Sequence, residues 1–201
     1  THLLALQALG VEIKPKASAY ALSTQGLKGG EIVLQEFSVT ATENVLLAAA
    51  LTPKKVIIKL AACEPHVQDL CLFLQKLGVK ISGLGTHTLE ITGQENLQGA
   101  QHAIIPDQIE IGTMAVLAAL THGEICMAPV IPEHLDLIIL KLRAIGIECV
   151  LEKEFLVVKH SPRALAAFRL QTFPYPGFPT DLQAPFGVLA TQCVGTSLIQ
   201  D

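Results

Sequence analysis

The chain has 201 residues, of which 50% are hydrophobic and 16% charged, and its formal net charge is −4. This slightly acidic balance, the lack of a basic block and an aromatic content of 4% disfavour nucleic acid as a partner. The mean hydropathy is +0.47, yet no apolar run approaches the roughly 18 residues that span a bilayer, and no signal peptide opens the chain. We therefore expect a cytoplasmic protein without a membrane segment, built as one large domain or two smaller ones.

The predicted elements recur along the chain with a period of 68 residues. The segments LGVEIK, LGVKIS and IGIECV place Gly10, Gly78 and Gly146 at this spacing. Upstream, EPHVQDLCLFLQKLG matches PEHLDLIILKLRAIG, and ATENVLLAAAL is echoed by EIGTMAVLAAL. Matches in register at several places indicate an internal structural repeat.

Each repeat predicts the same elements in the same order. We expect a helix, a strand, a second helix with proline in its first turn and glycine at its end, and then short strands. In the best-defined unit these elements cover 38–51, 54–61, 64–78, 79–83, 87–93 and, leading into the next unit, 101–106. The predicted order is βαβαββ. The loop GLGTH is expected to be a hairpin turn and not a dinucleotide-binding loop, because strands flank it on both sides.

The units do not coincide with the ends of the chain. Residues 1–35 correspond to the back half of a unit, 36–103 and 104–173 to complete units, and 174–201 to the front half of a fourth. We expect two lobes that separate close to Ile105–Pro106, in a chain that is part of a longer protein.

The five cysteines indicate neither a disulfide framework nor a metal site. Their number is odd and none form a CxxC pair, which favours reduced thiols. Cys63 and His66, with Cys71, lack a fourth ligand at a useful spacing, and Cys71 falls on the apolar stripe of its helix. We expect no metal ion and no other cofactor.

Residues that typically cap helix N-termini stand where the first helix of each unit begins. They are Ser38, Thr40, Asp107, Thr180 and Asp181. Two interpretations stay open, above all for Asp107. In the first, these residues only cap their own helices. In the second, several helix N-termini point toward one shared anionic ligand.

Asp181 ends the stretch FPYPGFPTD, in which three prolines within nine residues exclude a regular helix. Pro185 would disturb a turn begun at Asp181, so we expect the helix to start at least one residue later. Asp181 would then lie in a rigid loop and would not be a simple cap. A carboxylate fixed in this way suits a general base.

Four segments together resemble the bacterial UDP-N-acetylglucosamine enolpyruvyltransferases: SVTATENVLLAAAL, EPHVQDLCLFLQKLG, IIPDQIEIGT and FPTDLQA, in this order and spacing. The resemblance covers essentially the whole chain. It implies transfer of the enolpyruvyl group of phosphoenolpyruvate to the 3′-hydroxyl of UDP-N-acetylglucosamine, the first committed step of peptidoglycan synthesis. It also implies two inside-out α/β barrels of βαβαββ units, each incomplete here, with residues 1–105 in the first and 106–201 in the second.

The resemblance also implies roles for particular residues. Asp181 matches the aspartate that deprotonates the sugar hydroxyl. The loop that contacts the uridine diphosphate corresponds to Glu36, Phe37, Ser38, Val39 and Thr40. Further residues are expected in supporting positions around the cleft: His2, next to the uracil-binding segment, and the acidic Glu64, Asp107 and Glu110. The chain departs from the family at Thr40, where glycine is common, and at Glu36, where some members have lysine.

Three groups of the family fall outside these 201 residues: a Lys-Asn pair, the mobile loop with the proton-donating cysteine and its arginine, and C-terminal arginines. We therefore expect the chain alone to be inactive, and to self-associate through uncovered helix faces. Two alternatives remain: a catalytically silent nucleotide-sugar-binding or assembly protein, and a relative of 5-enolpyruvylshikimate-3-phosphate synthase. The motifs SVTATEN and FPTDLQ argue against the second.

Overall fold

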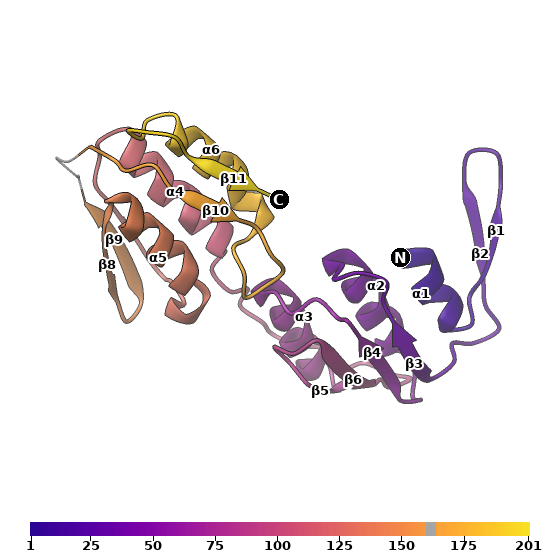
Figure 1. Cartoon of the computed structure of the whole chain (residues 1–201). Coiled ribbons are helices and arrows are strands. Elements are labelled where there is room, and N and C mark those ends of the chain that lie inside the picture. Colours follow the sequence, from indigo (N-terminus) through magenta and orange to yellow (C-terminus); the bar gives the residue numbers. More distant parts are fainter. Residues whose placement is uncertain (160–163) are drawn as a thin grey trace. The chain divides into compact units, whose positions relative to one another are not determined.

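The computed structural model describes residues 1–159 and 164–201 (Figure 1). The chain divides into two compact units, Thr1–Ile104 and Ile105–Asp201. Each unit has its own core of buried aliphatic side chains, and the core of unit 2 also contains the rings of Phe178 and Phe186. Over the described ranges, no helix combines the length and apolar character needed to cross a membrane.

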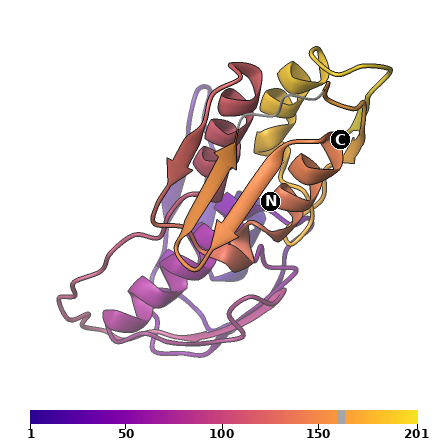
Figure 2. The same cartoon turned by 90° about the vertical axis from the view of Figure 1, so that its left-hand side faces the viewer.

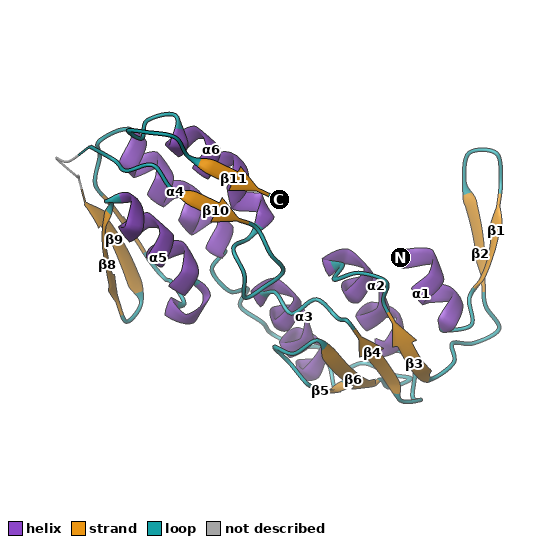
Figure 3. Ribbon diagram, in the orientation of Figure 1, coloured by secondary structure: helices purple, strands orange, loops and turns teal. Residues whose placement is uncertain are grey.

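Unit 1 contains three helices and six strands, and it follows the predicted order. Its elements are α1 (His2–Ala8), β1 (Glu12–Pro15), β2 (Tyr20–Ser23), β3 (Gly30–Val33), α2 (Val39–Ala50), β4 (Val56–Lys59), α3 (Pro65–Lys76), β5 (Lys80–Ser82) and β6 (Thr88–Thr92). The strands form a sheet of order β3-β4-β6-β5 and a separate antiparallel hairpin, β1-β2. The helices lie together on one side of the four-stranded sheet (Figure 3). The segment from β3 to β6 is therefore a complete βαβαββ unit, as predicted.

Within its described residues, unit 2 repeats this plan with one strand fewer in its larger sheet. Its elements are α4 (Gln108–Leu120), β7 (Ile125–Met127), η1 (Pro132–His134), α5 (Asp136–Ile145), β8 (Glu148–Glu152), β9 (Phe155–Lys159), β10 (Arg169–Gln171), η2 (Thr180–Leu182), α6 (Gln183–Ala190) and β11 (Leu198–Gln200). The sheets have the orders β7-β9-β8 and β10-β11, the latter a parallel pair. Figure 2 shows the β8–β9 hairpin in front of α4 and beside α5, whose apolar sides it covers.

Glycines in the left-handed region end the second helix of each repeat. Gly10, Gly78 and Gly146 have φ of +89°, +102° and +103°. In each case the next residue donates its N–H back to a carbonyl of the helix, as Val79 does to Leu74 O at 3.1 Å. This glycine-terminated helix end explains why these three positions repeat most clearly in the sequence.

The predicted strand over 101–106 is wrong, since the structure has no strand there. Instead, residues 98–102 are held along α3. Gln98 N donates to Leu77 O at 3.0 Å, and His102 Nε2 lies 2.8 Å from Asp69 Oδ1. These bonds to α3 replace a strand ladder, so unit 2 begins at α4 without a preceding strand.

Candidate functional site

The N-termini of α1 and α2 are joined by polar side chains. Thr1 Oγ1 donates to Glu36 Oε1, and Asn44 Nδ2 donates to His2 Nδ1 at 2.7 Å. His2 Nε2 lies 3.2 Å from Thr40 Oγ1. Because Nδ1 accepts from an amide, Nε2 carries the proton of the neutral ring and donates to Thr40. These contacts bring together His2, Glu36 and Thr40, three of the predicted site residues.

Ser38 is the N-cap of α2, and its Oγ accepts from Ala41 N at 3.3 Å. Its carbonyl accepts from Thr42 Oγ1 at 2.8 Å, and Thr42 Oγ1 in turn accepts from Ala62 N at 2.9 Å. Thr42 is fully buried. It therefore ties the first turn of α2 to the segment that leads into α3.

Phe37 and Glu64 lie at the same end of unit 1. The Phe37 ring packs on His87, with 4.5 Å between centroids, and His87 Nδ1 lies 2.8 Å from Ala61 O. Glu64 precedes α3, and its Oε2 is buried without a hydrogen-bond partner among the described residues. Burial, with a smaller contribution from the charge of Glu64, raises the pKa of the Cys63 thiol. Glu64 thus holds a carboxylate oxygen that the described chain leaves unsatisfied, which is costly unless another group meets it.

In unit 2, Asp107 acts as a cap, because its Oδ1 accepts from Ile109 N at 2.8 Å. Glu110 is exposed in the first turn of the same helix. Gly112, one turn further, allows η2 to approach α4, since a Cβ there would lie 2.6 Å from Leu182 Cδ1. The absence of a side chain at Gly112 thus positions the turn that carries Asp181.

Asp181 projects from η2, between two buried anchors. Phe178 packs edge-to-face on Phe186 at 4.8 Å between centroids, and Leu182 is fully buried. Asp181 itself is exposed, and its carboxylate makes no hydrogen bond or ion pair within the described part of the chain. Since α6 starts only at Gln183, Asp181 does not cap it.

Three residues that contact the predicted site residues were not themselves predicted: Thr1, Asn44 and His87. Asn44 could have been found, because it lies one helical turn after Thr40 and shares its face. Thr1 and His87 come from other elements, and only the folded chain places them here.

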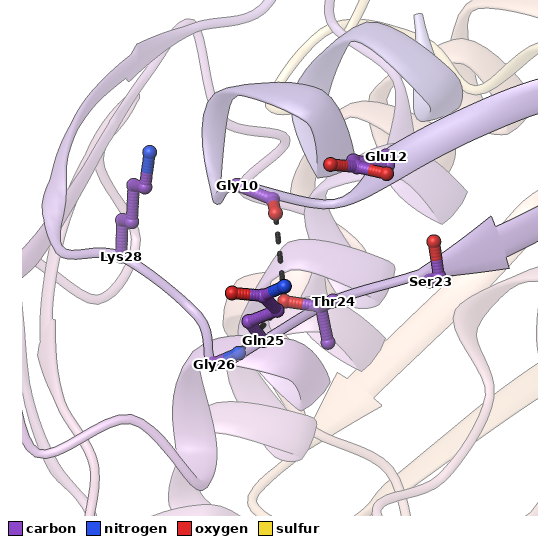
Figure 4. A pocket seen from close by; sticks show the side chains of 7 residues that line it. All are labelled: Gly10, Glu12, Ser23, Thr24, Gln25, Gly26 and Lys28. Atoms are coloured by element: carbon purple, nitrogen blue, oxygen red, sulfur yellow. Dashed lines mark hydrogen bonds between the residues drawn. The ribbon is translucent and has the colours of Figure 1, made fainter.

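A polar pocket of about 290 Å³ lies at the other end of α1, lined by Gly10, Glu12, Ser23, Thr24, Gln25, Gly26 and Lys28 (Figure 4). Thr24 Oγ1 donates to Gly10 O at 3.4 Å. In the next repeat Gln94 Nε2 donates to the equivalent carbonyl, that of Gly78. The two repeats therefore use different side chains to donate to the carbonyl of the glycine at the helix end, threonine in one and glutamine in the other. The pocket does not include any residue predicted to bind substrate. Across the described ranges, no three His, Cys, Asp or Glu residues are grouped to hold a metal ion.

Comparison with known proteins identifies the family. The sequence profile of EPSP synthase (3-phosphoshikimate 1-carboxyvinyltransferase) matches residues 1–201. The enolpyruvyl transferase NikO from Streptomyces tendae superposes with a TM-score of 0.84 at 20% identity, over 99% of this chain and 51% of that one. EPSP synthase from Acinetobacter baumannii gives 0.67 at 18% identity, over 97% of this chain and 46% of that one. The chain belongs to the EPSP synthase family of enolpyruvyl (1-carboxyvinyl) transferases, and the predicted fold class is confirmed.

Within this family, the chain is similar to proteins named UDP-N-acetylglucosamine 1-carboxyvinyltransferase. It is 44% identical to the Finegoldia magna protein and 43% identical to that of a Caulobacter species. Both matches include 100% of this chain, and they cover 48% of the first relative and 46% of the second. The Helicobacter pylori protein is 43% identical, with 48% of its length covered. The predicted resemblance is confirmed, and the chain spans about half the length of the curated relatives it matches.

Proposed function

We propose that the chain forms part of an enzyme that transfers the enolpyruvyl group of phosphoenolpyruvate to the 3′-hydroxyl of UDP-N-acetylglucosamine, in cytoplasmic peptidoglycan synthesis. One observation carries the proposal. Identity is 40–44% to proteins named for this sugar nucleotide, over nearly the whole chain, but 20% to the enolpyruvyl transferase NikO. Residues 1–105 would belong to the first barrel domain of the whole protein and 106–201 to the second.

The nucleotide sugar is proposed to bind at the N-terminus of α2. Val39 and Thr40 are the first two residues of this helix, whose leading N–H groups have no partner within the helix and carry partial positive charge. A diphosphate is the kind of anion that such a terminus binds. Ser38 orders this turn, while Glu36, Phe37 and His2 surround it and would contact the remainder of the nucleotide.

Asp181 is proposed as the general base that accepts the proton of the sugar hydroxyl. An attacking hydroxyl needs an acceptor for its proton, and a carboxylate without internal partners is available for that role. The buried Phe178 and Leu182 hold the turn on either side, so the carboxylate would need little reorganisation.

Glu64, Asp107 and Glu110 are proposed to line the cleft around the substrates. The buried oxygen of Glu64 would be satisfied by a donor on a substrate or on another part of the whole protein. Asp107 uses one carboxylate oxygen as a helix cap. Its second oxygen makes no hydrogen bond within the described residues and would be available for such a contact.

Phosphoenolpyruvate would need cationic groups beyond those described here. The chain has three arginines. Arg143 donates to Cys149 O at 2.8 Å, Arg169 is exposed on β10, and Arg163 lies outside the described residues. Bidentate arginine contacts are typical for phosphate and carboxylate groups. We therefore expect the 201-residue chain alone to release no phosphate from the two substrates above the enzyme-free rate.

The test uses the complete open reading frame that contains this chain. Asp181→Asn should lower turnover about 10²–10⁴-fold while changing UDP-N-acetylglucosamine affinity little, because shape is kept and the base is lost. Asp136→Asn, at an exposed position in the first turn of α5, is the matched control. Near-normal turnover of Asp181→Asn would contradict the general-base assignment. Binding of the nucleotide sugar without any turnover by the unmodified protein would favour a silent binding protein.

A further inference from the structure

Both ring nitrogens of His87 have partners within unit 1. His87 lies in the loop between β5 and β6, and its Nδ1 is 2.8 Å from Ala61 O. Because a carbonyl oxygen only accepts, Nδ1 carries the proton of the neutral ring and Nε2 is an acceptor. Cys63 Sγ lies 3.9 Å from Nε2. Burial raises the pKa of the Cys63 thiol, so the thiol keeps its proton and can donate it to Nε2. The ring of His87 therefore has a fixed tautomer and a fixed orientation.

The fixed ring packs on Phe37, in the loop that leads into α2. The two ring centroids are 4.5 Å apart and the ring planes are inclined by 54°. Aromatic rings at this separation attract each other beyond the area that they bury. Phe37 nevertheless remains 40% exposed. The contact therefore does not bury the Phe37 ring in the core, but holds an exposed aromatic side chain in one place.

This contact completes a closed path of interactions around the N-terminus of α2. The Ser38 carbonyl accepts from Thr42 Oγ1, which accepts in turn from Ala62 N. The preceding residue, Ala61, accepts from His87, whose ring packs on the residue before Ser38. The loop before α2 is thus held from two sides, and loss of the His87 ring would release one of them.

The equivalent place in unit 2 shows which of these contacts the fold requires. Ala61 N donates to His87 O at 3.1 Å, and in unit 2 Val130 N donates to Glu154 O at 2.9 Å. Both bonds join the segment after a strand to the turn of the next hairpin. The Glu154 side chain is exposed, and the residue before the N-cap of α4 is a proline. Unit 2 therefore closes this contact with backbone atoms alone, and the paired rings are an addition of unit 1.

We propose that His87 is a positioning residue, which holds the Phe37 ring in place for the nucleotide part of UDP-N-acetylglucosamine. This role rests on the function proposed above, in which Phe37 contacts the nucleotide. Both nitrogens of His87 are engaged within the chain, so the residue acts through Phe37 and not by proton transfer. An aromatic side chain that is ordered before binding does not have to lose its rotamer freedom when the ligand binds, and this favours affinity.

The substitution His87→Asn separates the hydrogen bond from the ring. The asparagine Nδ2 can take the place of the histidine Nδ1 and donate to Ala61 O, but no ring remains to pack on Phe37. In the protein encoded by the complete open reading frame, calorimetry should show the Kd for UDP-N-acetylglucosamine rising about threefold to tenfold. The kcat at saturating substrate should change less than about twofold. A purely structural role predicts normal affinity for this variant, so unchanged affinity, or a loss confined to kcat, would overturn the proposal.

A double-mutant cycle tests whether His87 acts through Phe37. Phe37→Ala should weaken binding at least as much as His87→Asn, and the two together should weaken it no further, because the ring that His87 holds is already gone. Additive losses would overturn the proposal. His66→Ala is the matched control, since His66 is an exposed histidine on α3 of the same unit, and an equal loss of affinity there would also overturn it. Circular dichroism checks that all variants are folded.

Nuclear magnetic resonance of the same protein without ligand tests the contact itself, so that this role and the proposed function can fail separately. With carbon-13-labelled phenylalanine, the Phe37 ring signals are assigned by their absence in Phe37→Ala. In His87→Asn they should move toward the positions of a freely exposed ring. Normal binding of the nucleotide sugar together with unchanged Phe37 signals would overturn the role of His87 and leave the proposed function intact. Shifted signals in a protein that binds no UDP-N-acetylglucosamine would contradict the proposed function, and with it the role of His87 in binding.

Discussion

The hairpins β1–β2 and β5–β6 have the same place in the repeat but different surroundings. Both follow a helix that ends at a left-handed glycine, and both pair antiparallel in matching register. Yet Ile91 is fully buried, whereas Leu22, its equivalent, is half exposed. The hairpin therefore forms from local sequence, while burial of its apolar face depends on the strand beside it.

The third hairpin, β8–β9, supports the same conclusion. It packs against β7, and Leu156 and Val158 are fully buried there. In two repeats out of three the neighbouring strand is present and the face is buried. The pairing within a hairpin and the burial of its apolar face thus depend on different elements of this fold, and they can be tested separately.

The largest expected effect contrasts Ile91→Lys with Leu22→Lys. A lysine at the buried position should destabilise unit 1 by more than about 4 kcal/mol, because an unpaired charge enters the core. At the half-exposed position the loss should stay below about 1 kcal/mol, since the ammonium group stays in water. Urea unfolding followed by circular dichroism, at a protein concentration too low for association, measures both. Similar losses would show that the two hairpins do not differ in burial.

The next effect tests whether the two cores are separate. Phe186 is fully buried and packs edge-to-face on Phe178. Phe186→Ala should destabilise unit 2 by about 3–5 kcal/mol and leave unit 1 unchanged. Hydrogen exchange read by mass spectrometry resolves the units. Phe37→Ala, at an exposed ring, is the control and should change neither. Increased exchange in both units of the Phe186 variant would contradict separate cores.

A smaller effect is expected at the helix end before β8. Gly146 has φ of +103°, and a Cβ there would meet no atom within 4 Å. Gly146→Ala should therefore cost about 1–2 kcal/mol from backbone strain alone. Gly187, inside α6 and also without close atoms, is the matched control, and alanine there should be neutral or slightly stabilising. Thermal melts compare the two, and equal shifts would argue against strain at Gly146.

The smallest expected effect is a pH dependence of the stability of unit 2 that arises from His134. Burial lowers the pKa of His134 below its usual 6.5, although Glu133 acts in the opposite direction. The unfolded chain then binds the proton more readily than the folded one, so stability is lost as pH falls through about 6.5. His66, the equivalent residue of unit 1, is exposed. His134→Gln should remove the acid-side loss in urea titrations, and an unchanged slope would contradict this origin.

The elements with strong periodicity were predictable. Apolar spacing, the proline of α3 and the glycines at positions 10, 78 and 146 located helices and hairpins within a few residues. The strand expected at 101–106 was wrong, because Gln98 and His102 bond to α3. No local sequence pattern shows that these residues will bond to α3 and not to a neighbouring strand, because α3 is a separate element of the chain.

The candidate site was predictable in part. Residue types and motifs singled out Ser38, Asp107 and Asp181, but not what each side chain does in the fold. The structure shows Asp107 as a cap and Asp181 without an internal partner. It also shows that Asn44 forms a hydrogen bond with His2. These distinctions depend on which atoms come within about 3 Å of each other, which sequence spacing does not specify.

The sequence by itself determined the repeat, the order of elements within it and the family, because helix periodicity, turn glycines and capping residues act over a few neighbouring positions. Tertiary structure alone decided which apolar faces are buried, since burial needs a second element to exclude water. It also decided that Gly112 lets the turn of Asp181 approach α4. Hydrophobic packing acts between segments distant in sequence, so Leu22 and Ile91 can look alike in the sequence and still differ in the fold.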